Sequence, residues 1–441
     1  MKRLLSLLLC AVLALFCATT AQAAGVSITL TASEYALHYA FDAGAQDPFV
    51  ILEYTTPAEK GWMMLYSADG RFEGDIALAY SGAGGKTSVA LTSARTTGSI
   101  GKASTTLPKA ADYQKPTGKS NAKVTDFVLT ETPEGFRYAF NAAGTDYMLL
   151  YWRSKEQTVT QPVYPDENGH YEGDVISDLT FARTQFTVQV KSGSGSMKKE
   201  ATVRKGYQAP EAPQRQEGRL SGVTVCIDAG HQENGRFVNE PIGPGLSGST
   251  SGKGGMAQGT KTNRRESIVC LEIGMILRDE LLRQGANVVM TREDQTTFHT
   301  NIERCEIAEA GGAQIMLRLH CNNSSNHSKR GIQVYGPLNS DYAKAVADAD
   351  TYREMGQKLL DAMKTRVGMT LANSTGMVRL NDNYVGNNWA KMMCFLVEMG
   401  YLSNPAEEYL LVTPVYQQWL AEGMADGVYE IAVARGWVQA Q

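Results

Sequence analysis

The chain has 441 residues, which at about 100–200 residues per domain predicts two to four domains. Hydrophobic residues make up 43% and charged residues 20%, a composition that argues against an intrinsically disordered chain. The net charge of -4 gives no electrostatic reason for a nucleic-acid partner, and we expect none. No apolar run of about 18 residues occurs beyond the first two dozen positions, so we expect no membrane span in the mature chain.

Residues 1–23 have the pattern of a secretory signal peptide. A basic start is followed by the apolar stretch 4–18, and Ala21-Gln22-Ala23 fits an Ala-x-Ala cleavage site. One alternative is an uncleaved membrane anchor, which the short apolar run disfavours. Another is a lipoprotein signal at Cys17, which the bulky residue before that cysteine disfavours. We therefore expect an exported protein that acts outside the cell, in the cell wall or in the periplasm.

The region that follows repeats itself with a period of 99 residues. Tyr39-Ala40-Phe41 recurs as Tyr138-Ala139-Phe140, and the Phe-Glu-Gly-Asp of 72–75 recurs as the Tyr-Glu-Gly-Asp of 171–174. Hydrophobic and polar residues alternate in both copies, and Asp-Gly or Asn-Gly pairs precede an aromatic strand, which is typical of β-hairpins. The repeat therefore predicts two similar β modules.

Each module is expected to be a small all-β sandwich of immunoglobulin or fibronectin type, the first at 24–110 and the second at 122–207. Neither contains a catalytic constellation, so we interpret them as spacers or as units that bind a cell-envelope ligand. Trp62 and Trp152 either stack on sugar rings at the module surface or pack in a core or rim. The Pro-containing polar segment 208–219 is the predicted linker to the next domain.

From 220 to 441 the sequence alternates between strand and helix patterns, which predicts an α/β domain with a largely parallel sheet. The predicted strands are 223–227, 287–291, 315–319, 331–335 and 393–397, and the predicted helices are 268–282, 302–310, 351–366 and a late helix that begins at 405–411.

The cysteines of this half are odd in number and include no Cys-x-x-Cys pair. A complete disulfide framework and a thiolate zinc site are therefore not expected. We interpret most of them as small buried hydrophobic residues: Cys226, Cys270, Cys305, Cys321 and Cys394.

Candidate metal ligands fall at strand ends in this domain. His231 comes just after the first predicted strand, His320 ends the third, and Glu398 ends the fifth. Because the carboxyl ends of parallel strands share one edge of a sheet, these side chains are expected to converge there. Glu266 precedes the first predicted helix, whose N-terminus faces the same edge. Two imidazoles and a carboxylate form a zinc set that leaves a position for water, and a further carboxylate can act as general base and acid.

Five separated segments carry a resemblance to a known family. They are Val225-Cys226-Ile227-Asp228-Ala229-Gly230-His231, Glu266 leading into Leu271, Val288-Val289-Met290-Thr291-Arg292, Leu317-Arg318-Leu319-His320-Cys321-Asn322, and the stretch 396–404 that begins Leu396-Val397-Glu398.

In this order, over about 222–435, the segments resemble the zinc-dependent N-acetylmuramoyl-L-alanine amidases of the Amidase_3 family. The resemblance implies zinc bound by His231, Glu266 and His320, with Glu398 as the catalytic carboxylate. It also implies peptidoglycan as substrate and hydrolysis of the amide between N-acetylmuramic acid and L-alanine.

Arg318 stands where many members of that family have a small residue. Because strand residues two apart share a face, Arg318 and His320 are expected on one side of the sheet. Arg318 is therefore a candidate catalytic residue that binds a peptide carboxylate or steadies an oxyanion, or alternatively it is part of an ion pair behind the site.

The glycine-rich segment 232–265 is either a lid or groove wall, or a surface loop.

The leading interpretation is an exported peptidoglycan hydrolase with two amino-terminal β modules, used in cell-wall remodelling, cell separation or lysis. One alternative is a non-catalytic protein that binds the cell wall or regulates its turnover, and the presence of all four proposed site residues argues against it. The other is a zinc amidohydrolase that acts on a different amide.

Overall fold

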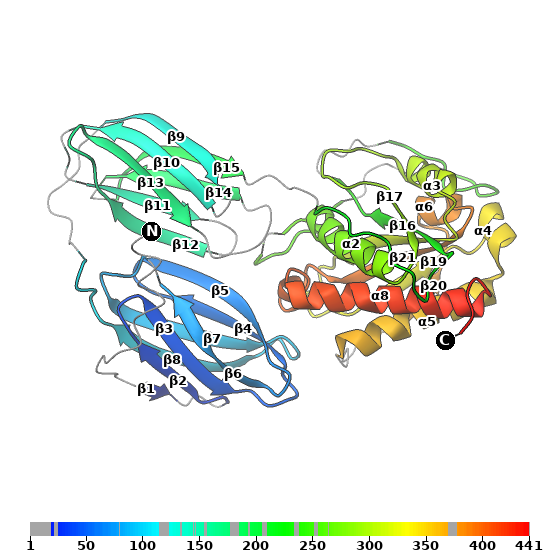
Figure 1. Cartoon of the computed structure of the whole chain (residues 1–441), viewed down its shortest axis with the longest axis horizontal. Coiled ribbons are helices and arrows are strands. Elements are labelled where there is room, and N and C mark those ends of the chain that lie inside the picture. The colour runs from blue at the N-terminus through cyan, green and yellow to red at the C-terminus, as the bar shows by residue number, and fades with distance from the viewer. Residues whose placement is uncertain are drawn as a thin grey trace. The chain divides into compact units, whose positions relative to one another are not determined.

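The computed structural model describes most of the chain (Figure 1). The described residues are 19–21, 25–78, 80–113, 123–132, 135–143, 145, 147–153, 157–176, 185–192, 195–204, 210–232, 238–250, 255–262, 264–368 and 377–440. The predicted signal peptide therefore lies outside the described residues except for its positions 19–21. Contacts divide the chain into two compact units, Met1–Gly206 and Tyr207–Gln441.

The first unit is built from strands, and its described residues contain no helix. The strands are β1 (Thr19–Ala21), β2 (Ile28–Ala32), β3 (Ala36–Asp42), β4 (Phe49–Thr55), β5 (Glu59–Tyr66), β6 (Arg71–Ala77), β7 (Gly85–Ser93), β8 (Ser99–Leu107), β9 (Val124–Thr132), β10 (Gly135–Ala142), β11 (Met148–Arg153), β12 (Gln157–Val163), β13 (His170–Ile176), β14 (Gln185–Lys191) and β15 (Met197–Arg204).

Each predicted module packs strands of two antiparallel layers around its own core. Strands β1-β2-β3-β6 face β5-β4-β7-β8 in the first, and β13-β10-β9 face β15-β14-β11-β12 in the second. Alternating apolar residues fill the cores, as the period-2 pattern predicts. The β-rich character of this region is confirmed, and the immunoglobulin or fibronectin type remains a prediction.

One layer of each module belongs to a sheet that both modules share. Strand β12 of the second module pairs antiparallel with β5 of the first over Gln157–Val159 and Glu59–Gly61, which joins eight strands in the order β15-β14-β11-β12-β5-β4-β7-β8. The sequence pattern predicts two modules but not the pairing between them. Backbone groups make that pairing between two edge strands, so it leaves no side-chain pattern.

The repeated motif marks the same cross-strand contact in both modules. Tyr39 lies opposite Gly74, and Tyr138 lies opposite Gly173. A Cβ atom on these glycines would stand 2.8 Å and 2.6 Å from the facing tyrosine hydroxyl. The glycine of each Glu-Gly-Asp motif is therefore needed because a tyrosine ring lies across its strand.

The two tryptophans singled out in the modules are both buried, but only Trp152 belongs to a module core. Trp62 is 9% exposed, and Trp152 is fully buried among Phe136, Phe186 and Tyr80. Stacking of a surface sugar on Trp152 is therefore excluded, and the burial of Trp62 favours packing over sugar stacking. Residues of this size are buried because they contribute much of the apolar area that a small β module needs.

The second unit alternates strands and helices. Its elements are β16 (Thr224–Ala229), α2 (Glu266–Arg283), β17 (Asn287–Met290), α3 (Asn301–Ala310), β18 (Ile315–Asn322), β19 (Gln333–Gly336), α4 (Asp341–Val346), α5 (Ala349–Val367), β20 (Met377–Leu380), α6 (Val385–Trp389), β21 (Met393–Tyr401), α7 (Glu407–Leu410) and α8 (Pro414–Ala434).

The six strands form one sheet in the order β17-β16-β18-β21-β19-β20 (Figure 1). Four neighbouring pairs run parallel, and β19 runs antiparallel to β21, so the sheet is mixed. Helix α8 packs against α2 and α5, which cover one face of the sheet, whereas α3 and α6 pack against each other and contact the opposite face. The predicted α/β alternation is confirmed, and α4, β20 and α6 are additional elements.

The segment predicted to be a linker is attached to the second unit. The guanidinium of Arg278 donates to the carbonyl of Pro210, the backbone N–H of Gln216 donates to Leu282, and Arg219 pairs with Asp426. Residues 210–219 therefore behave as the first segment of the α/β unit.

No helix in the described part of the chain is long and apolar enough to cross a membrane.

The five cysteines are all buried and free, as expected for small core residues.

Candidate metal centre

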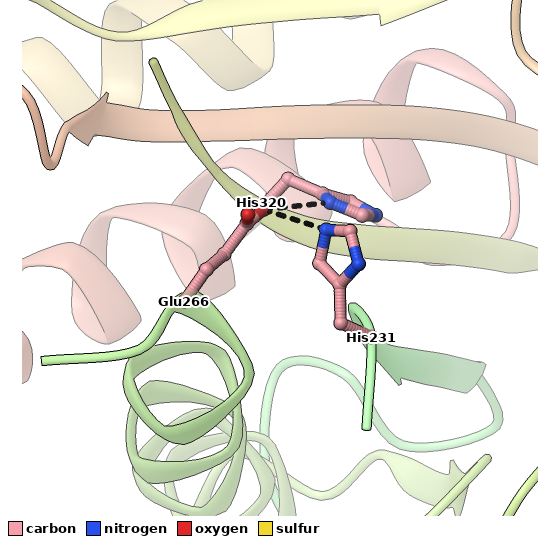
Figure 2. A group of neighbouring side chains, drawn as sticks. All are labelled: His231, Glu266 and His320. Atoms are coloured by element: carbon pink, nitrogen blue, oxygen red, sulfur yellow. Dashed lines mark hydrogen bonds and ion pairs between the residues drawn. The ribbon is translucent and has the colours of Figure 1, made fainter. Parts of the chain in front are cut away.

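Three of the predicted ligands converge at the carboxyl edge of the sheet. His231 follows β16, His320 lies on the neighbouring β18, and Glu266 is the first residue of α2. One ligand atom from each lies within 4.8 Å of the other two. Figure 2 shows both rings turned toward the Glu266 carboxylate. The strand-end argument thus brings together residues that are 35 and 54 positions apart in the sequence.

Glu266 is the centre of this group. Its Oε1 lies 2.9 Å from Nδ1 of His320 and 3.1 Å from Nε2 of His231. Backbone N–H groups of Cys321 and Ala257 donate to the two oxygens of the same carboxylate. Burial alone would raise its pKa, but the bonds and charges of the two histidines outweigh burial and hold the pKa of Glu266 well below its usual range. Glu266 is therefore a fixed, anionic carboxylate.

His231 is held in an unusual backbone conformation. Its φ is +58°, in the left-handed region that costs a non-glycine residue about 1–3 kcal/mol. The preceding Gly230 allows the second ring to approach, because a Cβ atom there would stand 2.5 Å from the carbonyl oxygen of Leu319 and 2.6 Å from Cε1 of His320. The order Gly-His is thus required by the space between the two strands.

Glu398 lies beside these residues on β21. It is the register partner of His320, so the two side chains stand on one face of adjacent strands. Its Oε2 is buried without a hydrogen-bond partner among the described residues. Burial, followed by the negative charge of Glu266, raises the pKa of Glu398 well above its usual value. A raised pKa makes the ionised carboxylate a stronger base, a property that suits a group that transfers protons.

The donor set fits a zinc ion. Two imidazoles and one carboxylate are the protein ligands of many catalytic zinc sites, which leave one position open. Nε2 of His320 is a second buried polar atom without a partner in the described part of the chain. Burial, as the largest effect, lowers the pKa of His320 and so favours the neutral ring that binds metals.

The sequence model of the Amidase_3 family, described as N-acetylmuramoyl-L-alanine amidase, matches residues 225–430. This range contains all four site residues. Residues 225–430 are an Amidase_3 domain.

Curated relatives of this domain are named as amidases. The chain is 26% identical over 231 residues to a germination-specific N-acetylmuramoyl-L-alanine amidase of Bacillus subtilis (strain 168), covering 49% of this chain and 83% of the relative. It is 27% identical over 218 residues to the probable cell wall amidase LytH of Staphylococcus aureus, covering 48% and 60%. The match thus spans less than two thirds of the LytH length. By family and relatives, the domain is of the N-acetylmuramoyl-L-alanine amidase class.

Solved amidase structures also align with about half of the chain. An N-acetylmuramoyl-L-alanine amidase from Clostridium difficile 630 has 23% identity and a TM-score of 0.38, covering 48% of this chain and 96% of its own. Ami1 from Mycobacterium abscessus has 21% identity and a TM-score of 0.44, covering 48% and 99%.

Arg318 lies behind the centre of the amidase domain and is 4% exposed. Its Nε donates to Oδ2 of Asp228 at 2.9 Å, and its Nη2 donates to Oδ1 of Asn301 at 2.7 Å. Its guanidinium also lies against Gly386, where a Cβ atom would be 2.3 Å from Cζ. This geometry favours the ion-pair alternative over a direct contact with substrate.

The described parts of the glycine-rich segment are fixed to the amidase domain. The carboxylate of Glu240 accepts from the backbone N–H groups of Asn301 and Ile302 at the start of α3. Glu408 accepts from the backbone N–H groups of Lys261 and Thr262. Glu240 therefore anchors the described stretch 238–250, and Glu408 anchors the described stretch 255–262. Residues 233–237 and 251–254 lie outside the described residues.

Sequence reasoning missed the buried charges around the strand that leads to His231. Asp228 is fully buried and pairs with both Arg304 and Arg318. Burial would raise its pKa, but the two arginine charges outweigh burial and hold the pKa well below its usual range. A carboxylate inside an apolar strand is the signal that could have indicated such partners.

Proposed function

We propose that the chain is an exported zinc hydrolase that cleaves the amide between N-acetylmuramic acid and L-alanine in peptidoglycan. The observation that carries the proposal is the convergence of His231, Glu266 and His320 inside an Amidase_3 domain, beside Glu398, whose Oε2 has no hydrogen-bond partner among the described residues. The relatives named as N-acetylmuramoyl-L-alanine and cell wall amidases support this substrate.

His231, Glu266 and His320 would hold the zinc ion. When bound, zinc polarises the scissile carbonyl and lowers the pKa of a coordinated water toward about 7. Both groups are in the protonation state that binds a metal: Glu266 is kept anionic by its partners, and burial keeps His320 neutral. Metal binding therefore requires no proton to be removed from either group near pH 7.

Glu398 would be the general base and then the general acid. Its side chain stands on the strand next to His320, and its raised pKa matches a group that takes a proton from the attacking water. As the amide C–N bond breaks, the same carboxyl returns the proton to the departing nitrogen of L-alanine. Arg318 would act indirectly, as the buried counter-ion of Asp228 under the site.

The amino-terminal half would serve export and placement. The pattern of residues 1–23 supports a cleaved signal peptide, and action outside the cell agrees with a relative named as a cell wall amidase. Because both tryptophans are buried, a cell-envelope ligand of the modules would bind through other groups. Cell-wall remodelling, cell separation and lysis are all compatible uses of this reaction.

The test is a digest of purified peptidoglycan by the full chain, followed by mass spectrometry of the products. New L-alanine amino termini with intact glycan strands are expected. The release should disappear after treatment with a chelator, return when zinc is added back, and be absent with Glu398→Gln.

Two other outcomes would contradict the proposal. Zinc binding without release from any type of peptidoglycan would favour a binding protein or another amide substrate. Release that persists in Glu398→Gln would exclude Glu398 as the proton-transfer group, and release unaffected by the chelator would exclude the metal.

A further inference from the structure

The turn that carries His231 exposes three consecutive carbonyl groups to buried cations. Ala229, Gly230 and His231 each direct their backbone oxygen at an arginine that comes from a distant part of the chain. A left-handed residue such as His231 persists only where its surroundings fix it. The contacts of these carbonyls therefore decide where the metal-ligand ring points.

Arg304, on helix α3, holds the two ends of this turn. It is 4% exposed, and its Nη1 donates to the carbonyl of Ala229 at 3.0 Å while its Nη2 donates to that of His231 at 3.2 Å. The same two nitrogens donate to the side chains of Asp228 and Gln232. One rigid guanidinium thus contacts four of the five residues from 228 to 232, all except Gly230.

Arg292, just after β17, holds the middle of the turn. It is 3% exposed, and its Nε donates to Ala229 at 2.7 Å while its Nη2 donates to Gly230 at 2.8 Å. Its Nη2 also donates to the carbonyl of Ser267, the residue after the metal ligand Glu266. Arg292 therefore ties the His231 turn to the first turn of α2, from which the second ligand comes.

Arg318 provides a matched comparison within the same network. It is as deeply buried as Arg304 and pairs with the other oxygen of the Asp228 carboxylate. Within the described part of the chain it makes no hydrogen bond to the carbonyls of the turn, and its second partner is the side chain of Asn301. Arg304 and Arg318 thus share Asp228 as a charge partner, but only Arg304 donates hydrogen bonds to the backbone carbonyls of the His231 turn.

We propose that Arg304 and Arg292 are positioning residues that fix the left-handed turn at His231 and so set the affinity of the site for zinc. The inference rests on the metal site of the proposed function. Both arginines bond the turn through several nitrogens of a planar fork, an arrangement that a lysine ammonium does not reproduce. Groups behind a metal ligand typically change metal affinity about 10- to 100-fold when they are replaced.

The test compares the full chain with Arg304→Lys, Arg292→Lys and Arg318→Lys. For each protein, the zinc dissociation constant is measured by competition with a chromophoric chelator, and unfolding of the metal-free protein is followed in urea. The absorption spectrum of the cobalt-substituted site reports the ligand geometry independently of activity. The wild-type constant is measured first, since absence of zinc binding there would refute the metal site itself.

Arg304→Lys and Arg292→Lys are expected to weaken zinc binding about 10- to 100-fold and to alter the cobalt spectrum. Arg318→Lys is expected to lower stability similarly but to keep the zinc constant within about threefold of wild type. Equal zinc affinity in all three variants would overturn the proposal. So would a loss of affinity in Arg318→Lys as large as in Arg304→Lys, or failure of both Arg304→Lys and Arg292→Lys to fold when Arg318→Lys folds.

Discussion

The ring of His320 occupies the space that a side chain on Gly230 would need. A Cβ atom at Gly230 would stand 2.6 Å from Cε1 and 2.7 Å from Nε2 of that ring. Gly230→Ala is therefore expected to displace one histidine relative to the other and to weaken zinc binding at least about tenfold. The overpacking is expected to cost about 1–3 kcal/mol of the free energy of unfolding. Zinc competition and urea unfolding measure the two effects.

Gly274 supplies the control for this substitution. It lies on α2 of the same domain, and a Cβ atom there would meet its nearest neighbours, Ile227 and Leu319, at 3.4 Å and 3.6 Å, which is ordinary contact. Gly274→Ala is expected to keep zinc affinity and to raise stability by about 0.5–1 kcal/mol, because alanine favours helix. Equal zinc affinity in Gly230→Ala and Gly274→Ala would refute the steric argument.

Glu398→Gln separates catalysis from folding. The replacement removes the group that takes and returns the proton, so the rate of amide release is expected to fall about 100- to 10,000-fold. Stability is expected not to decrease, because Oε2 makes no hydrogen bond that the amide would lose. Peptidoglycan digestion and urea unfolding are measured on the same preparation. A variant that is inactive and also strongly destabilised would show that Glu398 has a structural role instead.

Asp228→Asn is expected to be among the most destabilising changes in the domain. It leaves Arg304 and Arg318 buried without their anion, which typically costs about 3–5 kcal/mol. Since the folded pKa of Asp228 lies well below the unfolded value, its contribution is fully present above about pH 4 and is lost as the pH falls further. The stability difference between wild type and Asp228→Asn, measured in urea, is therefore expected to shrink in acid. A difference independent of pH between 2 and 7 would contradict this.

Much of the metal centre could be predicted from the sequence, and the reason is topological. Parallel strands end at one edge, so the strand pattern predicts that His231, His320 and Glu398 lie together, whereas their roles as zinc ligands and catalytic carboxylate rest on the family resemblance. The hydrogen bonds from Arg304 to the His231 turn could not be predicted, because the sequence pattern of an arginine in an amphipathic helix is that of a solvated residue. Its burial depends on where α3 packs, which no local pattern encodes.

The same limit applies to the β modules. Alternation predicts the buried positions of β3 and β10, since side chains on one face of a strand recur every second residue. The pairing of β12 with β5 is made by backbone groups, which every residue has, so the sequence does not specify it. The short elements β20 and α6 were missed because four or five residues are too few to show a period.

Glu407 is expected to make the amidase domain less stable as the pH rises toward neutrality. Burial raises its pKa to about 7, although the N–H groups of Tyr401 and Gly331 and the charge of Arg330 oppose that rise. Because the folded pKa exceeds the unfolded value of about 4.3, the stabilising protonated form is fully present below about pH 4 and its contribution is lost as the pH rises through 7.

Over this range the loss is expected to amount to about 3–4 kcal/mol of the free energy of unfolding. Glu407→Gln removes the titrating group, so urea unfolding of this variant is expected to lack that part of the pH dependence. Its matched control is Glu408→Gln, since the neighbouring Glu408 is also buried but accepts from Lys261 and Thr262 on the other side of the turn. If Glu407→Gln keeps the wild-type slope between pH 4.5 and 7.5, the assignment of this pH dependence to Glu407 is wrong.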